Sequence, residues 1–282
     1  MYNKNHIKEM TRLLTLKGCT PGTINAYQAC MKKVLTFLDK PVDDITTDDL
    51  LDYLQHMITL GRTSSTINQN HSIINFFFSQ VLRKHHIVAP LPFMRKIKKL
   101  PEILTITEVE AILNCSQNLK HKTIFMTIYG SGLRIGEVLR LRVSDIDSKK
   151  MQLRIKEGKG RKDRYTILSE RNLKCLRDYY RTYQPNDLLF FPYSYKDKPM
   201  SKNTIEKEFK STIAAAGINK KVTPHSLRHA FASHLLENGT DIYTIKSLLG
   251  HSTLRSTEVY LQLSPSLVFS TKSPLDQESA NE

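Results

Sequence analysis

Six side chains in this 282-residue sequence have types and spacings that suit chemistry on a phosphate group. An arginine lies two residues after a glycine in SGLRIGEVLRL, and a lysine lies between two turn glycines in GKGRKD. HSLRHAFASHLL places a histidine and an arginine three residues apart, on one face of a predicted helix. HSTLRSTEVY adds a histidine and, nine residues later on what we predict to be one short helix, a tyrosine. These candidate catalytic residues are Arg134, Lys159, His225, Arg228, His251 and Tyr260.

Together these residue types can transfer a phosphoryl group without a metal ion. Two guanidiniums bind phosphate oxygens and keep their charge, and imidazoles exchange protons near neutral pH. A turn lysine can protonate a leaving oxygen, and a phenol can attack phosphorus to form a covalent ester. A free phenol, with a pKa of about 10, needs surrounding cations to do so at neutral pH. No convergent Asp/Glu pair of the kind that holds Mg²⁺ accompanies the set, so we expect neither metal nor cofactor.

Each member of the set also has a purely structural interpretation. Arg134 could form an ion pair with Glu137 at helical spacing, and we assign Glu137 a supporting role only. Lys159 could belong to a general phosphate clamp with its basic neighbours, although its position between two glycines favours catalysis. These neighbours are Lys156, Arg161, Lys162 and Arg164.

The histidines and the tyrosine have structural alternatives as well. His225 and His229 show the i, i+4 spacing of a zinc pair, but the glutamate of H-E-x-x-H is missing, which disfavours metal. His251 follows a glycine and could cap a helix. Tyr260 could pack in the core, as we predict for Tyr243. The ordered set of matches favours the catalytic interpretation for all of them together.

The composition predicts a polyanionic partner. Lys and Arg number 42 against 27 Asp and Glu, which gives a net charge of +15, and nucleic acid is the commonest polyanion for such proteins. The four cysteines form no C-x-x-C pair and are expected to be reduced thiols. The N-terminus lacks a signal-peptide stretch and no window reaches the ~18 apolar residues of a membrane span, so we predict a cytoplasmic location without membrane contact.

Residues 1–88 predict a helical domain. Thr20 with Pro21 marks the start of one helix, and Thr46 with Asp49 marks the start of a second. A third is expected from about residue 65 to residue 81. Basic side chains on these helices could face phosphates or be ordinary solvated charges; they include Lys32, Lys33, Arg62 and Lys84.

Residues 89–103 predict a basic linker, because prolines at positions 90, 92 and 101 exclude a continuous helix. Its charges suit a strap along a DNA backbone. The candidate DNA-binding residues are Arg95, Lys96, Lys98 and Lys99 of this linker, with Arg161 and Lys162 of the GKGRKD turn.

Residues 104–282 predict a second domain, mainly helical with a small antiparallel sheet. Thr105 and Glu108 fit a capping box at its first helix. Apolar and polar residues alternate from Met151 to Ile155, and the segment Tyr165–Leu168 is expected to return as a second strand.

The six candidate residues, in this order and at similar spacing, closely resemble the signature of the tyrosine recombinase (phage integrase) family. LLGHSTLRSTEVY is similar to the end of that signature, and the catalytic resemblance spans roughly residues 104–262. Residues 1–88 are similar in kind to the family's helical, SAM-like core-DNA-binding domain. The layout, without a further arm-site domain in front, looks like the compact Xer-type, integron or transposon-borne members.

This resemblance implies a site-specific recombinase with two domains that close around DNA as a C-shaped clamp. It implies that Tyr260 forms a 3′-phosphotyrosyl bond, that Arg134 and Arg228 hold the phosphate, and that Lys159 protonates the 5′ oxygen. It further implies that His225 is the general base, that His251 donates a hydrogen bond, and that neither metal nor ATP takes part. The implied assembly is a homotetramer, or a heterotetramer with a related recombinase, on two specific double-stranded DNA sites.

Two alternatives remain at this point: a DNA-binding accessory protein without catalysis, and strand relaxation of the type IB topoisomerase kind. The sequence names neither the target DNA nor the biological role, because base readout depends on side-chain placement and DNA deformability.

Overall fold

The computed structural model describes residues 4–95, 102–156, 163–195 and 197–263. The chain divides into two compact units, Met1–Lys99 and Leu100–Glu282, each with a hydrophobic core of its own. Across the described ranges, none of the helices combines the length and apolar character needed to span a bilayer.

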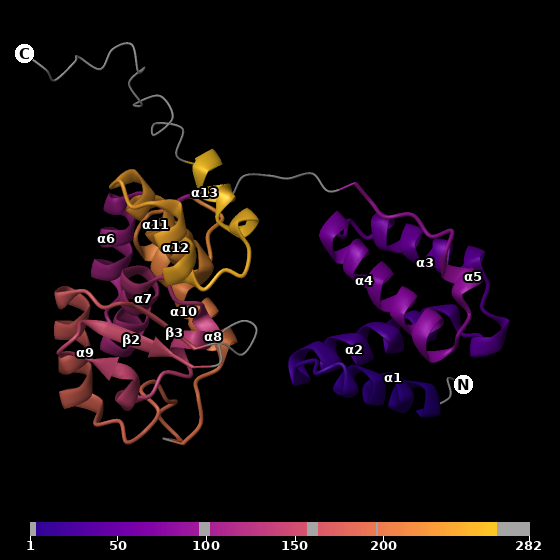
Figure 1. Ribbon diagram of the computed structural model, residues 1–282, viewed down its shortest axis with the longest axis horizontal. Helices are drawn as coiled ribbons and strands as arrows, with labels where there is room; N and C mark the ends of the chain where they lie inside the picture. Colours follow the sequence, from indigo (N-terminus) through magenta and orange to yellow (C-terminus); the bar gives the residue numbers. More distant parts are fainter. Residues whose placement is uncertain (1–3, 96–101, 157–162, 196, 264–282) are drawn as a thin grey trace, which may run out of the picture. The chain divides into compact units, whose positions relative to one another are not determined.

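The N-terminal unit is helical over its described residues, as predicted. Its helices are α1 (Lys4–Leu16), α2 (Pro21–Leu38), α3 (Thr47–Thr59), α4 (Ser64–Phe76) and α5 (His85–Val88), with a 3-10 turn at Val42–Asp44 and a π-helical turn at Phe77–Val81 (Figure 1). Thr20 caps α2 ahead of Pro21. At α3, Asp49 accepts a bond from the Thr46 amide at 2.9 Å and Thr46 accepts one from the Asp49 amide, so the predicted start is confirmed.

The first part of the predicted linker packs onto the N-terminal unit. Leu91 is buried in that unit's core, and Met94 makes two backbone hydrogen bonds to the Asn68 side chain, at 2.8 and 2.9 Å. Arg95 is exposed and lies in neither a helix nor a strand. Lys96, Lys98 and Lys99 lie outside the described residues.

The second unit is mainly helical with a small antiparallel sheet, as predicted. Its helices are α6 (Ile106–Cys115), α7 (Leu119–Ser131), α8 (Ile135–Val138), α9 (Glu170–Tyr183), α10 (Lys202–Ala215), α11 (Pro224–Glu237), α12 (Ile242–Leu249) and α13 (Glu258–Leu263), with 3-10 turns at Val143–Asp145 and Leu254–Ser256. Thr105 and Glu108 form the predicted capping box of α6. The central helix α7 is buried on most sides, because α11 and α9 both pack against it (Figure 1).

The sheet has the order β1-β2-β3 and is antiparallel throughout. Its strands are β1 (Ile146–Asp147), β2 (Gln152–Ile155) and β3 (Arg164–Ile167). The two predicted strands are confirmed as β2 and β3, in a register that pairs Leu153 with Thr166. The two-residue strand β1 had no alternating pattern to announce it. The turn between β2 and β3, with Lys159, Arg161 and Lys162, lies outside the described residues.

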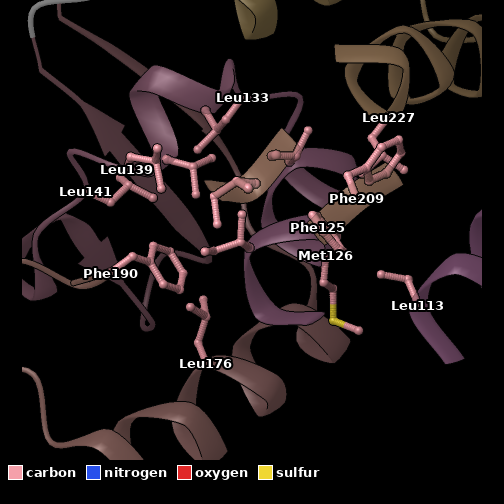
Figure 2. Close-up of a cluster of buried hydrophobic side chains, with 14 of the residues drawn as sticks. Leu113, Phe125, Met126, Leu133, Leu139, Leu141, Leu176, Phe190, Phe209 and Leu227 are labelled. Carbon is pink, nitrogen blue, oxygen red and sulfur yellow. The ribbon is translucent and has the colours of Figure 1, made fainter. Parts of the chain in front are cut away.

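The hydrophobic core of the second unit holds these elements together. Figure 2 shows Phe125 and Met126 of α7 among side chains from α9, α10 and α11. The rings of Phe125 and Phe209 meet edge to face with centroids 5.2 Å apart, which joins α7 to α10. This packing fixes α7, which ends just before Arg134, and α11, which carries His225 and Arg228.

Candidate active site

The end of α7 sets the position of Arg134. Gly132 closes that helix in the left-handed conformation, with φ of +64°. A Cβ at this position would lie 2.4 Å from the ring of Phe231 on α11, so only glycine fits. The chain then turns at once into the short helix α8, and Arg134 is its N-cap residue.

Glu137 holds two guanidiniums and lies near a third. Its carboxylate accepts a bond from the Arg134 side chain at 2.8 Å and two bonds from Arg164, both at 2.9 Å. The guanidinium of Arg228 lies 3.7 Å away. Burial alone would raise the pKa of Glu137, but the hydrogen bonds and charge of Arg164, helped by Arg134, outweigh it and lower the pKa to about 2. The carboxylate of Glu137 is therefore ionised at neutral pH, and it holds the guanidiniums of Arg134 and Arg164 in place.

Arg228 lies on α11 and its side chain is only 1% exposed. One guanidinium nitrogen donates to the Gly132 carbonyl at 2.7 Å, and the other donates to the Leu249 carbonyl at 2.8 Å. These carbonyls end α7 and α12, so two helix C-termini, each carrying partial negative charge, point at one buried cation. Burial, with the charge of Arg134, lowers the pKa of Arg228 to about 9, which leaves it charged at neutral pH.

His251 reaches the same guanidinium from a loop. Gly250 ends α12 with φ of +64°, and His251 follows it directly. Its Nε2 lies 3.1 Å from Nη2 of Arg228, and its Nδ1 lies 2.9 Å from the hydroxyl of Thr257. Because a guanidinium can only donate, Nε2 accepts here and Nδ1–H donates to Thr257. His251 precedes the 3-10 turn and Tyr260 lies on α13, so the prediction that one short helix carries both was wrong.

Tyr260 is 2% exposed and packs with Phe231 and Leu249. Its hydroxyl lies 3.0 Å from Nδ1 of His229, one turn after His225 on α11. Burial raises the pKa of Tyr260, and the charges of Arg228 and Arg134 partly oppose that effect. The tyrosine is thus both part of the core and close to the arginines. The prediction of a core position for Tyr243 was wrong, since that ring is 69% exposed.

The structure brings five of the six candidate catalytic residues together, in two contact groups that meet on α11; Lys159 lies outside the described residues. Arg134 joins Arg228 through Glu137, and His251 contacts Arg228 directly. Tyr260 connects to His225 through the intervening His229, because the two imidazole rings have centroids 4.6 Å apart.

Three further residues of the cluster were missed as candidates: Arg164, His229 and Thr257. The i, i+4 spacing of His225 and His229 was a signal, but it pointed to zinc. Arg164 reaches Glu137 across 27 residues, and no local pattern in the sequence distinguishes it from its basic neighbours.

Family models match both units of the chain. The phage integrase family model matches residues 102–266, and the model for the phage integrase N-terminal SAM-like domain matches residues 7–87. Among curated relatives, a putative integrase/recombinase, y4qK, of Sinorhizobium fredii is 37% identical over 90% of this chain and 84% of its own length. Tyrosine recombinase XerD of Staphylococcus epidermidis is 32% identical over 89% of this chain and 91% of its own.

The fold also matches solved structures. A lambda integrase dimer bound to a core site superposes with a TM-score of 0.73 and 20% identity, and the match covers 89% of this chain and 95% of the other. At that identity the likeness concerns the fold alone. Since the family model covers more than half of the chain and both relatives align along most of it, this protein belongs to the phage integrase family and is an enzyme of the tyrosine recombinase/integrase class.

Proposed function

We propose that this protein cuts and rejoins double-stranded DNA at specific sites through a 3′-phosphotyrosyl intermediate on Tyr260, without metal or ATP. The observation that carries the proposal is the cluster of fixed cations around one buried tyrosine. The charges of Arg228 and Arg134 favour the phenolate and so oppose the effect of burial on the pKa of Tyr260. Such preorganised charge is what a phosphoryl transition state requires.

Each of the six candidate catalytic residues has a role in this proposal. Arg134 and Arg228 bind the non-bridging oxygens of the scissile phosphate, and His251 donates a hydrogen bond to it. The Tyr260 oxygen forms a bond to phosphorus while the bond from phosphorus to the 5′ oxygen breaks. Lys159, whose assignment comes from the motif alone, protonates that leaving oxygen.

The remaining proton and the reverse step complete the cycle. The phenol's proton leaves by way of His225, which the family's signature makes the general base and which is exposed on α11. A 5′ hydroxyl from a neighbouring strand then attacks the phosphotyrosyl bond and releases Tyr260. The covalent ester conserves the energy of the broken bond, and for that reason the cycle needs no ATP.

The solved structure of a lambda integrase dimer bound to a core site supports duplex DNA as the partner of this chain. We propose that residues 1–88 form a core-DNA-binding domain, residues 89–103 a linker and residues 104–282 the catalytic domain. Two pairs of subunits would act on two paired sites as a tetramer, in the cytoplasm where the DNA is.

The direct test is to trap the covalent intermediate. Nicked duplexes drawn from the DNA that flanks the protein's own gene would be incubated with the chain and resolved on a denaturing gel. A covalent adduct is expected in the presence of EDTA. Tyr260→Phe should bind the same DNA and form no adduct, and persistence of the adduct in that variant would refute the assignment.

The same preparation separates the two alternatives. An accessory protein would bind the duplex and form no adduct even with Tyr260 intact. A topoisomerase of type IB would relax supercoiled plasmids equally with and without the target site, whereas a site-specific recombinase acts only where the site is present.

A further inference from the structure

Two histidines of α11 follow one another outward from Tyr260: His229 contacts the tyrosine, and His225 contacts His229. His229 contacts the Tyr260 hydroxyl through Nδ1 at 3.0 Å. The ring of His225 meets the ring of His229 edge to face, with centroids 4.6 Å apart, and His225 is exposed to solvent. Tyr260 is thus connected to solvent through two imidazoles on one helix.

The direction of the bond between Tyr260 and His229 follows from burial. Tyr260 is 2% exposed, so its O–H donor needs a protein acceptor. An imidazole Nδ1 without a proton is such an acceptor, and we assign the O–H as donating to it. The acidities agree: burial raises the pKa of Tyr260, which keeps the phenol protonated. Burial, followed by the charges of His225 and Arg228, lowers the pKa of His229 to about 4, which keeps that imidazole neutral.

We propose that His229 is a catalytic residue: it is the immediate acceptor of the Tyr260 proton, which His225 then passes to solvent. This inference rests on the proposed function and names a residue that the six-member set lacks. In the step, the phenol O–H bond breaks and an Nδ1–H bond forms as the phenolic oxygen bonds to phosphorus. The 5′ oxygen departs with its electron pair and takes its own proton from Lys159. The imidazolium of His229 returns to neutrality by releasing the proton on Nε2.

Charged groups on all sides decide when His229 can hold a proton. His225 and Arg228 lie on its own helix, and Arg134 and Glu137 come from the α8 segment that faces the same end of α11. Without DNA, burial and, after it, the charges of His225 and Arg228 disfavour an imidazolium at His229. A bound phosphate adds negative charge at Arg134 and Arg228, so the proton transfer becomes favourable only when substrate is in place.

The test measures proton transfer from Tyr260 separately from proton transfer to the leaving group. The substrate is the duplex that forms the adduct, with sulfur in place of the bridging 5′ oxygen, because a thiolate departs without needing an acid. For the wild-type protein at saturating DNA, the adduct rate is expected to be flat from pH 7 to pH 9. A rise of tenfold per pH unit across that range would mean that no internal base takes the proton, and would overturn the proposal without any variant.

His229→Asn provides the matched variant, because its amide oxygen can accept the phenol's hydrogen bond at the position of Nδ1 but cannot take a proton. We expect its rate to fall about 100-fold at pH 7, within the range of general base catalysis, and to rise tenfold per pH unit so that the gap closes by pH 9. DNA affinity and thermal unfolding should match the wild type. His225→Asn should cost less, because solvent can also accept the second proton.

The other outcomes are equally decisive. If His229→Asn keeps a flat profile at the wild-type rate while His229→Ala is impaired, His229 only positions the ring and the proposal fails. If His225→Asn shows the larger loss and the pH-dependent profile, the proton goes to His225 directly. Failure of the proposed function itself would look different, since the wild-type protein would then form no adduct with either oxygen or sulfur substrate.

Discussion

Basic side chains are exposed in one region of this molecule, the groove of the N-terminal unit, and buried in another, the candidate active site of the second unit. In the N-terminal unit, Lys32, Lys33 and Arg62 line an open groove of about 760 Å³ between α2, α3 and α4, and all three are exposed. In the second unit, the guanidiniums of Arg164 and Arg228 are largely or wholly withdrawn from water and arranged around one carboxylate.

The difference between the two regions lies in how each positive charge is solvated. An exposed charge is solvated whether or not DNA is present, so it adds affinity that salt can screen. A buried charge has lost its water and must find hydrogen bonds elsewhere, here from Glu137 and from two helix C-termini. The groove is therefore expected to control binding, and the buried cluster to control chemistry and stability together.

Among substitutions in the buried cluster, Arg228→Met should have the largest effect on the adduct rate and on stability. It removes the charge from the proposed phosphate site and leaves the Gly132 and Leu249 carbonyls without their donor. We expect the single-turnover adduct rate at saturating DNA to fall by about 10²–10³. The free energy of unfolding, measured in urea, should fall by about 3–5 kcal/mol.

Arg62→Met is the matched control, because it makes the same substitution in the open groove. It should leave both quantities within experimental error once the DNA is saturating. An adduct rate for Arg228→Met within tenfold of the wild type would remove Arg228 from the chemistry and erase the proposed contrast between the regions.

Glu137→Gln tests the buried cluster through the pH dependence of protein stability. The pKa of Glu137 is lowered from 4.5 to about 2 in the folded chain, so the carboxylate stabilises the fold above its unfolded pKa by about 3 kcal/mol. As the pH falls from about 4.5 to about 2, the group protonates and the wild type loses this stabilisation. The variant should be less stable at pH 7 and the two should converge in that window, as followed by urea unfolding at pH 7, 4.5 and 3. A gap that does not change with pH would contradict the assignment.

Local rules predicted the elements of this fold better than they predicted the site. The capping box of Thr46 and Asp49 and the alternation of β2 involve neighbours in sequence, so their physical cause is visible in the sequence itself. The contact of Tyr260 with His229 joins positions 31 residues apart and depends on how α13 packs against α11. Tyr243 shows the same limit, because the eight-residue helix α12 is too short for periodicity to say which face its ring occupies.

Thr257→Val should have a smaller effect, one confined to His251. In the observed state Nδ1–H of His251 donates to Thr257, while donation from Nε2 to a phosphate requires the other tautomer. A hydroxyl serves both tautomers, because it can accept or donate. Valine has a similar shape and can do neither, so we expect about a tenfold slower adduct rate and a stability loss of about 1–2 kcal/mol.

Thr257→Ser is the control and should restore both values, since it keeps the hydroxyl. Ring ¹⁵N shifts of His251 would report the tautomer directly. Equal rates for the valine and serine variants would mean that the hydroxyl has no part in positioning His251.

Substitutions in the groove should have the smallest effect on the chemical step. If the two regions have separate roles, these substitutions should change DNA affinity and leave the adduct rate unchanged. Replacing Lys32, Lys33 and Arg62 by glutamine should reduce the slope of log affinity against log salt by about 0.9 for each phosphate that these side chains neutralise in the wild type. Lys84→Gln is the control, because its ammonium is already paired with Asp43 at 2.8 Å. The adduct rate of the bound complex should not change, because these side chains belong to the other unit. If the slope stayed the same while the rate at saturation fell, the groove would not be the binding surface and the two kinds of cation would not be separate.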